Sequence, residues 1–129
     1  MSSPTFPTPR TASPSPRTTS PTPTFHAYAV AIQLARAVRS VIPLVARHDP
    51  SLADQLRRAV TSVPLNVAEG NRRVGKDRPH LFRVALGSAA EVQACLDVAE
   101  ALGYLAREAV QPALAPADRV QRLLRGLTR

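Results

Sequence analysis

The sequence predicts an all-α protein: an up-and-down antiparallel four-helix bundle preceded by a disordered N-terminal tail. Three observations lead to this prediction. Apolar residues recur at spacings of three and four from Phe25 onward, turn and capping residues divide that region into four segments, and the region before it cannot bury a core. We therefore divide the chain into a tail, residues 1–24, and a bundle, residues 25–129. A length of 129 residues leaves room for one domain.

The tail is defined by its composition. It contains seven proline, seven threonine and five serine residues, with Arg10 and Arg17 as its only charges. Proline lacks a backbone N–H, and hydroxyl side chains compete for local hydrogen bonds, so we predict an extended arm of polyproline-like character. We interpret such an arm as a linker, or as the product of a gene start assigned too far upstream. The alternative interpretation is that its arginines contact a phosphate backbone.

The first two helices are predicted from their apolar stripes. The first begins at Phe25, and its stripe consists of Tyr28, Ile32, Ala35, Val38 and Ile42. Pro43 ends or kinks this helix because its ring clashes with the preceding turn. The second helix spans residues 52–74 after the capping segment 48–51, and Pro64 is expected to bend it. Its buried stripe consists of Leu56, Val60, Val63, Val67 and Val74.

The third and fourth helices follow a glycine turn. Gly75 ends the second helix and Asp77 caps the third. The third helix has the strict three-four repeat of bundle packing, formed by Phe82, Ala85, Ala89, Val92, Leu96, Ala99 and Gly103. The closing helix is predicted after Pro116 and Asp118. It directs Val120, Leu124 and Leu127 toward the core, and Arg119, Arg122 and Arg125 outward.

The composition argues against an enzyme. Aromatic residues make up 4% of the chain, so the core must be built from alanine, valine and leucine, which form little of the concave surface that lines a cofactor pocket. His26, His48 and His80 have no histidine or carboxylate three or four residues further on, so no metal site is predicted. Cys95 is expected to be a small buried thiol. The five glycines stand singly and form no phosphate-binding loop, so we predict no cofactor and no small-molecule substrate.

The location is predicted from three absences in the sequence. No apolar run approaches the roughly 18 residues that span a bilayer, and the N-terminus has no hydrophobic stretch of the secretory type. A single cysteine allows no intrachain disulfide, so nothing indicates an oxidising compartment. We therefore expect a cytoplasmic protein without membrane contact.

The charge indicates a polyanion or an acidic protein as partner. Seventeen lysine and arginine residues stand against nine acidic ones, and all but Lys76 are arginine. Arginine suits phosphate recognition, although a GC-rich genome equally produces arginine in place of lysine. The densest region is predicted to form one continuous nucleic-acid-binding patch of Arg57, Arg58, Arg72, Arg73, Lys76, Arg78 and Arg83. Phe82, the aromatic residue of this region, is assigned to the core, so the predicted contact is with the nucleic-acid backbone.

Two residues of the second helix have open interpretations. Glu69 lies among arginines, where it forms an intrahelical ion pair with Arg72 or Arg73, or belongs to a polar cluster at an interface. Leu65 is apolar on an otherwise polar face, which predicts a surface for a partner.

Two blocks of sequence resemble a known family. Residues 55–70, QLRRAVTSVPLNVAEG, contain the pattern Ser-x-Pro-x-Asn-x-Ala-Glu-Gly, and residues 85–92, ALGSAAEV, contain Leu-Gly-Ser-x-x-Glu. Together with Leu-Gly-Tyr-Leu at 102–105, they resemble the bacterial four-helix-bundle proteins encoded in intervening sequences of large-subunit ribosomal RNA genes. The resemblance covers residues 25–129. The family's usual tryptophan in the first helix is missing, with Tyr28 or Phe25 in its place, so the packing of that helix is expected to differ.

The resemblance implies a homopentamer, in a family most of whose members have no known enzymatic activity. Through a related branch, the accessory protein of diversity-generating retroelements, it also implies RNA, DNA or a reverse transcriptase as partner. The positions carried over as family motif and interface are Ser62, Pro64, Leu65, Asn66, Glu69, Gly70, Ser88 and Glu91, of which Pro64 and Gly70 serve the shape of the helix.

We therefore predict a non-enzymatic homo-oligomeric binding module that presents a basic surface to nucleic acid or to a nucleic-acid enzyme. The alternative is a structural oligomeric scaffold that contacts another protein, through Leu65, and binds no nucleic acid.

Overall fold

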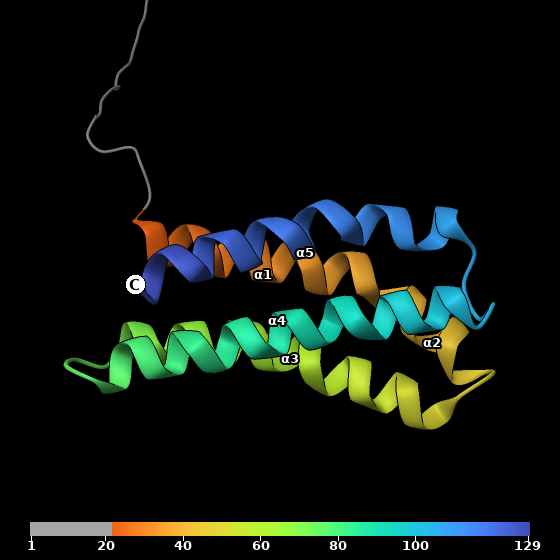
Figure 1. The fold of residues 1–129 in the computed structure, drawn as a ribbon, viewed down its shortest axis with the longest axis horizontal. Helices are drawn as coiled ribbons and strands as arrows, with labels where there is room; N and C mark the ends of the chain where they lie inside the picture. Colours follow the sequence, from red (N-terminus) through yellow and green to blue (C-terminus); the bar gives the residue numbers. More distant parts are fainter. Residues whose placement is uncertain (1–21) are drawn as a thin grey trace, which may run out of the picture.

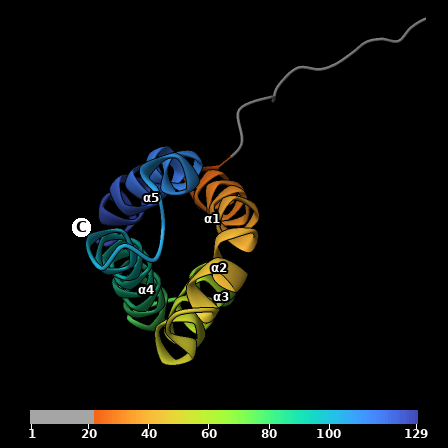
Figure 2. The same ribbon diagram turned by 90° about the vertical axis from the view of Figure 1, so that its right-hand side faces the viewer.

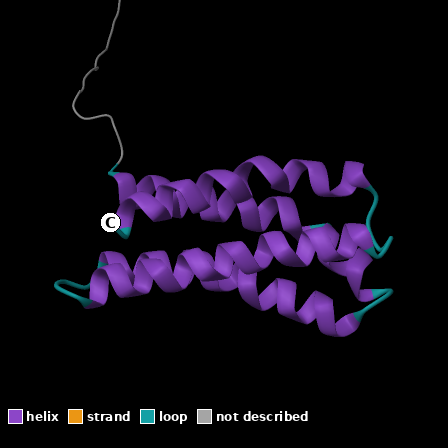
Figure 3. Cartoon of the chain, in the orientation of Figure 1, coloured by secondary structure: helices purple, strands orange, loops and turns teal. Residues whose placement is uncertain are grey.

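The computed structural model describes residues 22–129, and all regular elements in that range are helices (Figure 3). They are α1 (Pro23–Arg39), α2 (Val41–Ala46), α3 (Pro50–Asn71), α4 (Asp77–Ala101) and α5 (Arg107–Leu127). The predicted all-α bundle of four long helices is confirmed, with the short α2 as an addition. The predicted tail falls mostly on residues 1–21, outside the described residues, but Pro23 and Thr24 belong to α1.

The four long helices form a closed ring of neighbours. α1 packs against α5 and α3, and α4 packs against α3 and α5, so the helices occupy four corners when viewed along the bundle (Figure 2). Neighbours run in opposite directions, as the up-and-down topology requires (Figure 1). The α3–α4 turn, the start of α1 and the end of α5 lie at one end, which we call the Gly75 end. The α2–α3 and α4–α5 turns lie at the other, which we call the Tyr104 end.

The core consists of small and aliphatic side chains, as predicted. Phe82 is the one aromatic residue buried in residues 22–129. The seam of α3, Leu56, Val60, Val63 and Val67, and that of α4, from Phe82 to Ala99, are buried as predicted. The repeat of apolar residues at spacings of three and four identified both seams.

The predicted buried stripe of α1 is wrong. Of its five residues only Val38 is buried, and Tyr28 is 38% exposed. The observed seam is Thr24, Ala27, Ala31, Leu34 and Val38, joined by Val30. Residues 27–32 are all apolar, so two stripes about 100° apart satisfy the same spacing. The structure buries the stripe that contains two alanines, because small side chains let α1 approach its neighbours, and the bulky Tyr28 is left at the surface.

The predicted boundary between the first two helices is confirmed. α1 ends at Arg39. In a continuous helix the carbonyl of Arg39 would accept a hydrogen bond from the backbone N–H of residue 43, but Pro43 has no N–H to donate. α2 then contains Pro43 itself. Asp49 is the N-cap of α3, where its Oδ1 accepts a hydrogen bond from the backbone N–H of Leu52 at 3.0 Å, and Pro50 takes the first helical position. α3 changes direction midway along its length, as expected for a helix that contains Pro64 (Figure 1).

Three details of the turns differ from the prediction. α3 ends at Asn71, so Val74 is 85% exposed in the turn and is not a core residue. Lys76 occupies the N-cap position of α4, and Asp77 is the first helical residue and makes no capping bond. Gly103 is exposed and has a φ of 78°, which suits the left-handed conformation after a helix and not a place in the seam.

The closing helix is longer than predicted. α5 begins at Arg107 and continues through Pro112 and Pro116, whereas the prediction started it after Pro116. These prolines lie four residues apart on the outer side, and the carbonyls that they leave unpaired, those of Glu108 and Pro112, belong to exposed residues that water can reach. The apolar repeat Val110, Ala113, Ala117, Val120 and Leu124 is buried throughout, whereas Leu127 is only partly buried.

α3 and α4 approach each other closely at Gly70. A Cβ atom added to Gly70 would lie 2.7 Å from Cε1 and 2.9 Å from Cδ1 of Phe82, and 3.3 Å from Cβ of Leu81. The Phe82 ring is fully buried and has no room to withdraw. Gly70 is therefore required by the packing, as the resemblance implied for its role in shape.

We expect Gly70→Ala to destabilise the fold by about 1–3 kcal/mol, because overpacking at Phe82 outweighs the helical preference of alanine. Urea denaturation followed by circular dichroism measures the effect. Gly126→Ala is the matched control, since nothing lies within 4 Å of the added Cβ, and it should not lower stability. Equal stability of the two variants would contradict the role assigned to Gly70.

Candidate functional site

The seven predicted nucleic-acid-binding residues do not form one continuous patch. Arg57 and Arg58 precede Arg72 by about 14 residues on the same helix, which separates them by roughly 21 Å at 1.5 Å per residue. Both arginines form ion pairs with Asp54 of their own helix. They lie nearer the Tyr104 end, whereas the other five surround the α3–α4 turn.

Arg78 supports the fold at the Gly75 end. Its guanidinium lies 5.1 Å from the centre of the Phe82 ring and donates hydrogen bonds to the carbonyls of Gly70 and Asn71 at 3.4 and 3.2 Å. The same group donates to Oγ1 of Thr24 at 3.2 Å. Because these contacts occupy Arg78 in joining α1, α3 and α4, it is less available to phosphate than the exposed arginines.

Glu69 is engaged by Arg73. Nε and Nη2 of Arg73 lie 2.9 and 2.6 Å from Oε2 of Glu69, so the predicted ion pair is present with Arg73 as the partner, although Arg73 lies just beyond the end of α3 and the pair is not within the helix. Arg73 also approaches Asp77 at 3.6 Å. Both pairs are about half exposed and contribute little to stability, but they neutralise the two acidic residues of this end.

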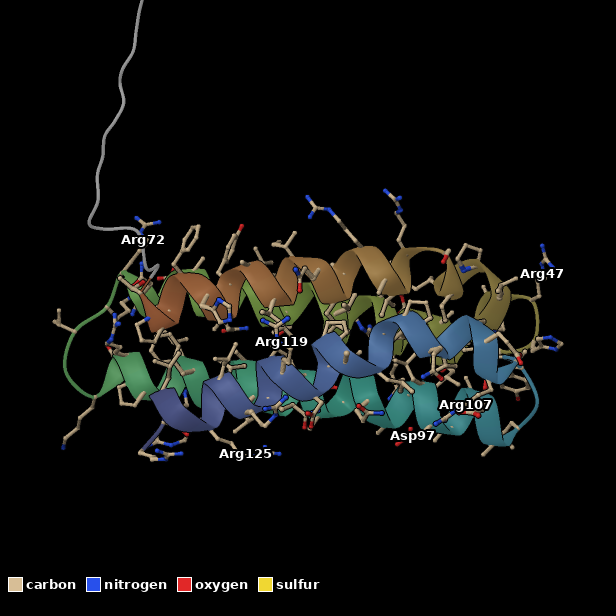
Figure 4. All side chains as sticks on the ribbon, turned by 90° about the horizontal axis from the view of Figure 1, so that it is seen from above. Arg47, Arg72, Asp97, Arg107, Arg119 and Arg125 are labelled. Carbon is tan, nitrogen blue, oxygen red and sulfur yellow. The ribbon has the colours of Figure 1, made fainter. Side chains whose placement is uncertain are left out.

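The excess of basic charge on the bundle is concentrated at one end. Within two helical turns of the Gly75 end, eight basic residues of the described chain stand against Glu69 and Asp77, and the eight are Arg72, Arg73, Lys76, Arg78, Arg83, Arg122, Arg125 and Arg129. Around the Tyr104 end the charges balance, since five arginines stand against five acidic residues: Arg39, Arg47, Arg57, Arg58 and Arg107 against Asp49, Asp54, Asp97, Glu100 and Glu108. Figure 4 shows Arg72 and Arg125 toward one end, and Arg47, Asp97 and Arg107 toward the other.

A hollow of about 340 Å³ opens between α1 and α3 at the Gly75 end. It is lined by Thr24, Phe25, Tyr28, Val67, Ala68, Asn71 and Arg72. Phe25 is 60% exposed, so two aromatic rings face this surface beside an arginine. The sequence prediction missed the hollow because it placed Tyr28 in the core. The sequence signal for the hollow is the run of alanines beside Tyr28. These small residues suit the buried side of the helix better than Tyr28 does, which leaves Tyr28 at the surface.

The motif residues connect α3 and α4 by a small polar cluster. The Ser88 hydroxyl donates to Oγ of Ser62 at 2.8 Å, and Nδ2 of Asn66 donates to the carbonyl and to Oγ of Ser62, both at 2.9 Å. All three residues are partly buried. Pro64 is buried beside them on α3. Ser62 and Ser88 therefore join the two helices, whereas Asn66 bonds only within α3.

Leu65 points away from the core, as predicted. It is 62% exposed and lines a hollow of about 310 Å³ together with Arg57, Arg58, Thr61, Ser62 and Asn66. Glu91, the last of the carried-over positions, is exposed on α4.

Cys95 is buried, as predicted. Burial, and secondly the negative charge of Glu91, raise the pKa of its thiol above the usual value. The thiol therefore remains protonated at neutral pH and behaves as a small apolar group. Among residues 22–129, histidine, cysteine and acidic side chains do not gather in groups of three that could hold a metal ion. No helix of the same range is both long and apolar enough to cross a membrane.

The outer side of α4 is apolar although it packs against no other part of the described chain. Val84, Val98 and Leu102 are exposed there, and the positions between them are small, with Gly87, Ala90, Ala94 and Ala101 also exposed. We call these seven residues the α4 face. Glu91 is exposed within this face, between Gly87 and Ala94 on the same line of the helix, and the exposed Arg83 and Asp97 lie beside it. An apolar surface of this kind on a helix is typical of an interface.

Residues 24–126 match the sequence profile of a family described as 23S rRNA-intervening sequence protein. The chain belongs to this family. The match covers nearly the whole bundle, and the family resemblance is thereby confirmed.

A crystal structure has the same fold as this family member. It is that of a protein with unknown function from the S23 ribosomal protein family of Bacteroides thetaiotaomicron, with a TM-score of 0.72 and 17% sequence identity. The similarity covers 80% of this chain and 98% of the other. A comparison with curated proteins gave no match.

The polar cluster leads to a testable prediction. Ser62→Ala and Ser88→Ala should each cost about 0.5–1.5 kcal/mol, and the double variant should cost less than the sum, because the second change no longer leaves a hydroxyl without its partner. Denaturation of the four proteins in a double-mutant cycle gives the coupling. Thr61→Ala is the control, since that exposed hydroxyl bonds only a carbonyl of its own helix, at 2.7 Å. Strictly additive costs would contradict the predicted coupling.

Proposed function

We propose that the protein is a non-enzymatic homo-oligomeric binding module that presents its Gly75 end to nucleic acid or to a nucleic-acid enzyme such as a reverse transcriptase. The observation that carries the proposal is the concentration of basic charge at one end of the bundle. A concentrated basic surface attracts a polyanion by releasing the cations condensed on it, whereas the same charges spread evenly would only solvate the protein.

The side chains offered to phosphate are the basic ones that the fold leaves exposed. Arg72, Lys76 and Arg83 are exposed, and within the described chain they make no ion pair with an acidic side chain. Their elements all meet at the α3–α4 turn, and the end of α5 adds Arg125 and Arg129. Because these side chains are long and cationic, contact with the phosphate backbone is their expected mode.

Self-association through the α4 face is the second part of the proposal. The exposed valines and Leu102, with small residues between them, would allow a second helix to approach closely and bury apolar area that water now covers. The family resemblance favours a pentamer. An assembly that holds subunits side by side would place several Gly75 ends together and raise the affinity for a long polyanion.

A structural scaffold that binds another protein is the second candidate. Its support is Leu65, a large apolar side chain exposed beside Arg57 and Arg58 in a hollow. An apolar contact surrounded by arginines suits an acidic protein surface and needs no nucleic acid. The two candidates use different regions of α3, so variants distinguish them.

Charge reversal at the Gly75 end tests the nucleic-acid contact. Arg72→Glu with Lys76→Glu should weaken binding of RNA or DNA at least about tenfold and flatten the dependence of log affinity on log salt by about two units, the share of two phosphate contacts. Fluorescence anisotropy with a labelled oligonucleotide, titrated at several salt concentrations, measures both.

Arg57→Glu with Arg58→Glu is the matched control, because it changes the charge equally at the other group of arginines. It should alter binding much less. Equal losses in the two double variants would mean that only the total charge matters, and affinity independent of salt would contradict phosphate contact altogether.

The α4 face gives a separate prediction. Val98→Glu, at a residue that is 44% exposed, should dissociate the oligomer without unfolding the subunit, because a carboxylate cannot be buried unpaired in an apolar contact. Light scattering coupled to size exclusion gives the mass, and circular dichroism checks the fold. Leu65→Glu, an equally polar change on α3, should leave the mass unchanged. Dissociation by Leu65→Glu and not by Val98→Glu would move the interface to α3.

A further inference from the structure

We propose that the hollow between α1 and α3 is a stacking site for an unpaired base of single-stranded nucleic acid. The inference rests on the proposed function and deepens it, since it names the strand form that the Gly75 end selects. Phe25 and Tyr28 supply the rings, and Arg72 supplies the charge for the adjoining phosphate.

The two rings are held on one side of α1. Phe25 and Tyr28 are three residues apart, so they lie on neighbouring positions of the helix surface. Thr24 and Ala27 fix the orientation of this turn by being buried, and Oγ1 of Thr22 accepts a hydrogen bond from the backbone N–H of Phe25 at 3.0 Å. Both rings are exposed because the seam of α1 uses the alanines, and exposing aromatic surface costs free energy that a stacked base would recover.

The opposite wall supplies polar groups with a suitable spacing. Ala68, Asn71 and Arg72 lie three and four residues apart on α3, so they line one side of the hollow. Ala68 is small and leaves room for a planar ring. The amide of Asn71 can donate to and accept from a base edge, and the guanidinium of Arg72 suits a phosphate oxygen.

Arg72 is available for this role. In the part of the chain that the structure describes, its guanidinium makes no ion pair, no side-chain hydrogen bond and no contact over an aromatic ring, unlike its neighbours Arg73 and Arg78. The surrounding excess of basic residues favours a polyanion over a neutral or cationic ligand. At about 340 Å³ the hollow is at the lower limit of ligand sites, which suits one base rather than a dinucleotide cofactor.

Strand form is the property that separates this site from a general basic surface. Aromatic rings stack on the faces of unpaired bases, whereas the bases of a duplex are already stacked on each other. A surface that offers only arginines binds the higher charge density of the duplex at least as well. Preference for a single strand is therefore the signature of the proposed site.

The test compares a labelled single strand with its duplex, using the full chain at low salt and fluorescence anisotropy. Wild type should bind the single strand more tightly. Tyr28→Leu and Phe25→Leu should weaken that binding by roughly 5- to 150-fold, the loss of one stacked base, and leave duplex binding unchanged. Tyr28→Phe is the matched control because it keeps the ring, and it should bind like wild type.

Each other outcome has a distinct meaning. If both leucine variants bind the single strand as tightly as wild type, while Arg72→Glu with Lys76→Glu weakens binding, the stacking site is overturned and the proposed function stands. If wild type binds neither strand form, the proposed function fails, and the stacking site fails with it. If Tyr28→Leu lowers the mass found by light scattering, the hollow is a contact between subunits, which also overturns the inference.

Discussion

The close contact of α3 with α4 at Gly70 is the constraint on which the rest of this bundle depends. Only a residue without Cβ admits the Phe82 ring at that distance, and the ring in turn supports Arg78. Arg78 then bonds two carbonyls at the end of α3 and reaches Thr24 at the start of α1. Three helices are thus joined at one end, and the short turn brings the surrounding basic residues close together.

The buried side of a helix was predicted correctly where its apolar residues repeat clearly along one side, and less well where they do not. The seams of α3 and α4 were predicted because apolar residues recur there at spacings of three and four, although Val74 and Gly103, placed at their ends, are exposed. α1 is apolar around most of its first turns, so spacing could not choose between the Tyr28 stripe and the Ala27 stripe, and packing against neighbours decided. In α5 the prolines were given too much weight, although the buried repeat that begins at Val110 extends across both of them.

The candidate site shows a different limit of sequence reasoning. Density of arginine along the chain joined Arg57 to Arg72, but a helix carries residues about 14 positions apart to different regions of the molecule. The antiparallel course of α5 does the reverse and brings Arg125, more than forty positions further on, to the same end as Arg78. Both effects depend on topology, so they become predictable only after the order of the helices is known.

The placement of the two tyrosines has a spectroscopic consequence. The chain contains no tryptophan, Tyr28 borders the hollow at the Gly75 end, and Tyr104 is stacked on His48 at the opposite end, with ring centres 5.0 Å apart. Their intrinsic fluorescence therefore originates from two sites nearly a bundle length apart. Removing either phenol leaves a single native reporter for one extremity, so events at the two ends can be followed independently without attaching a dye.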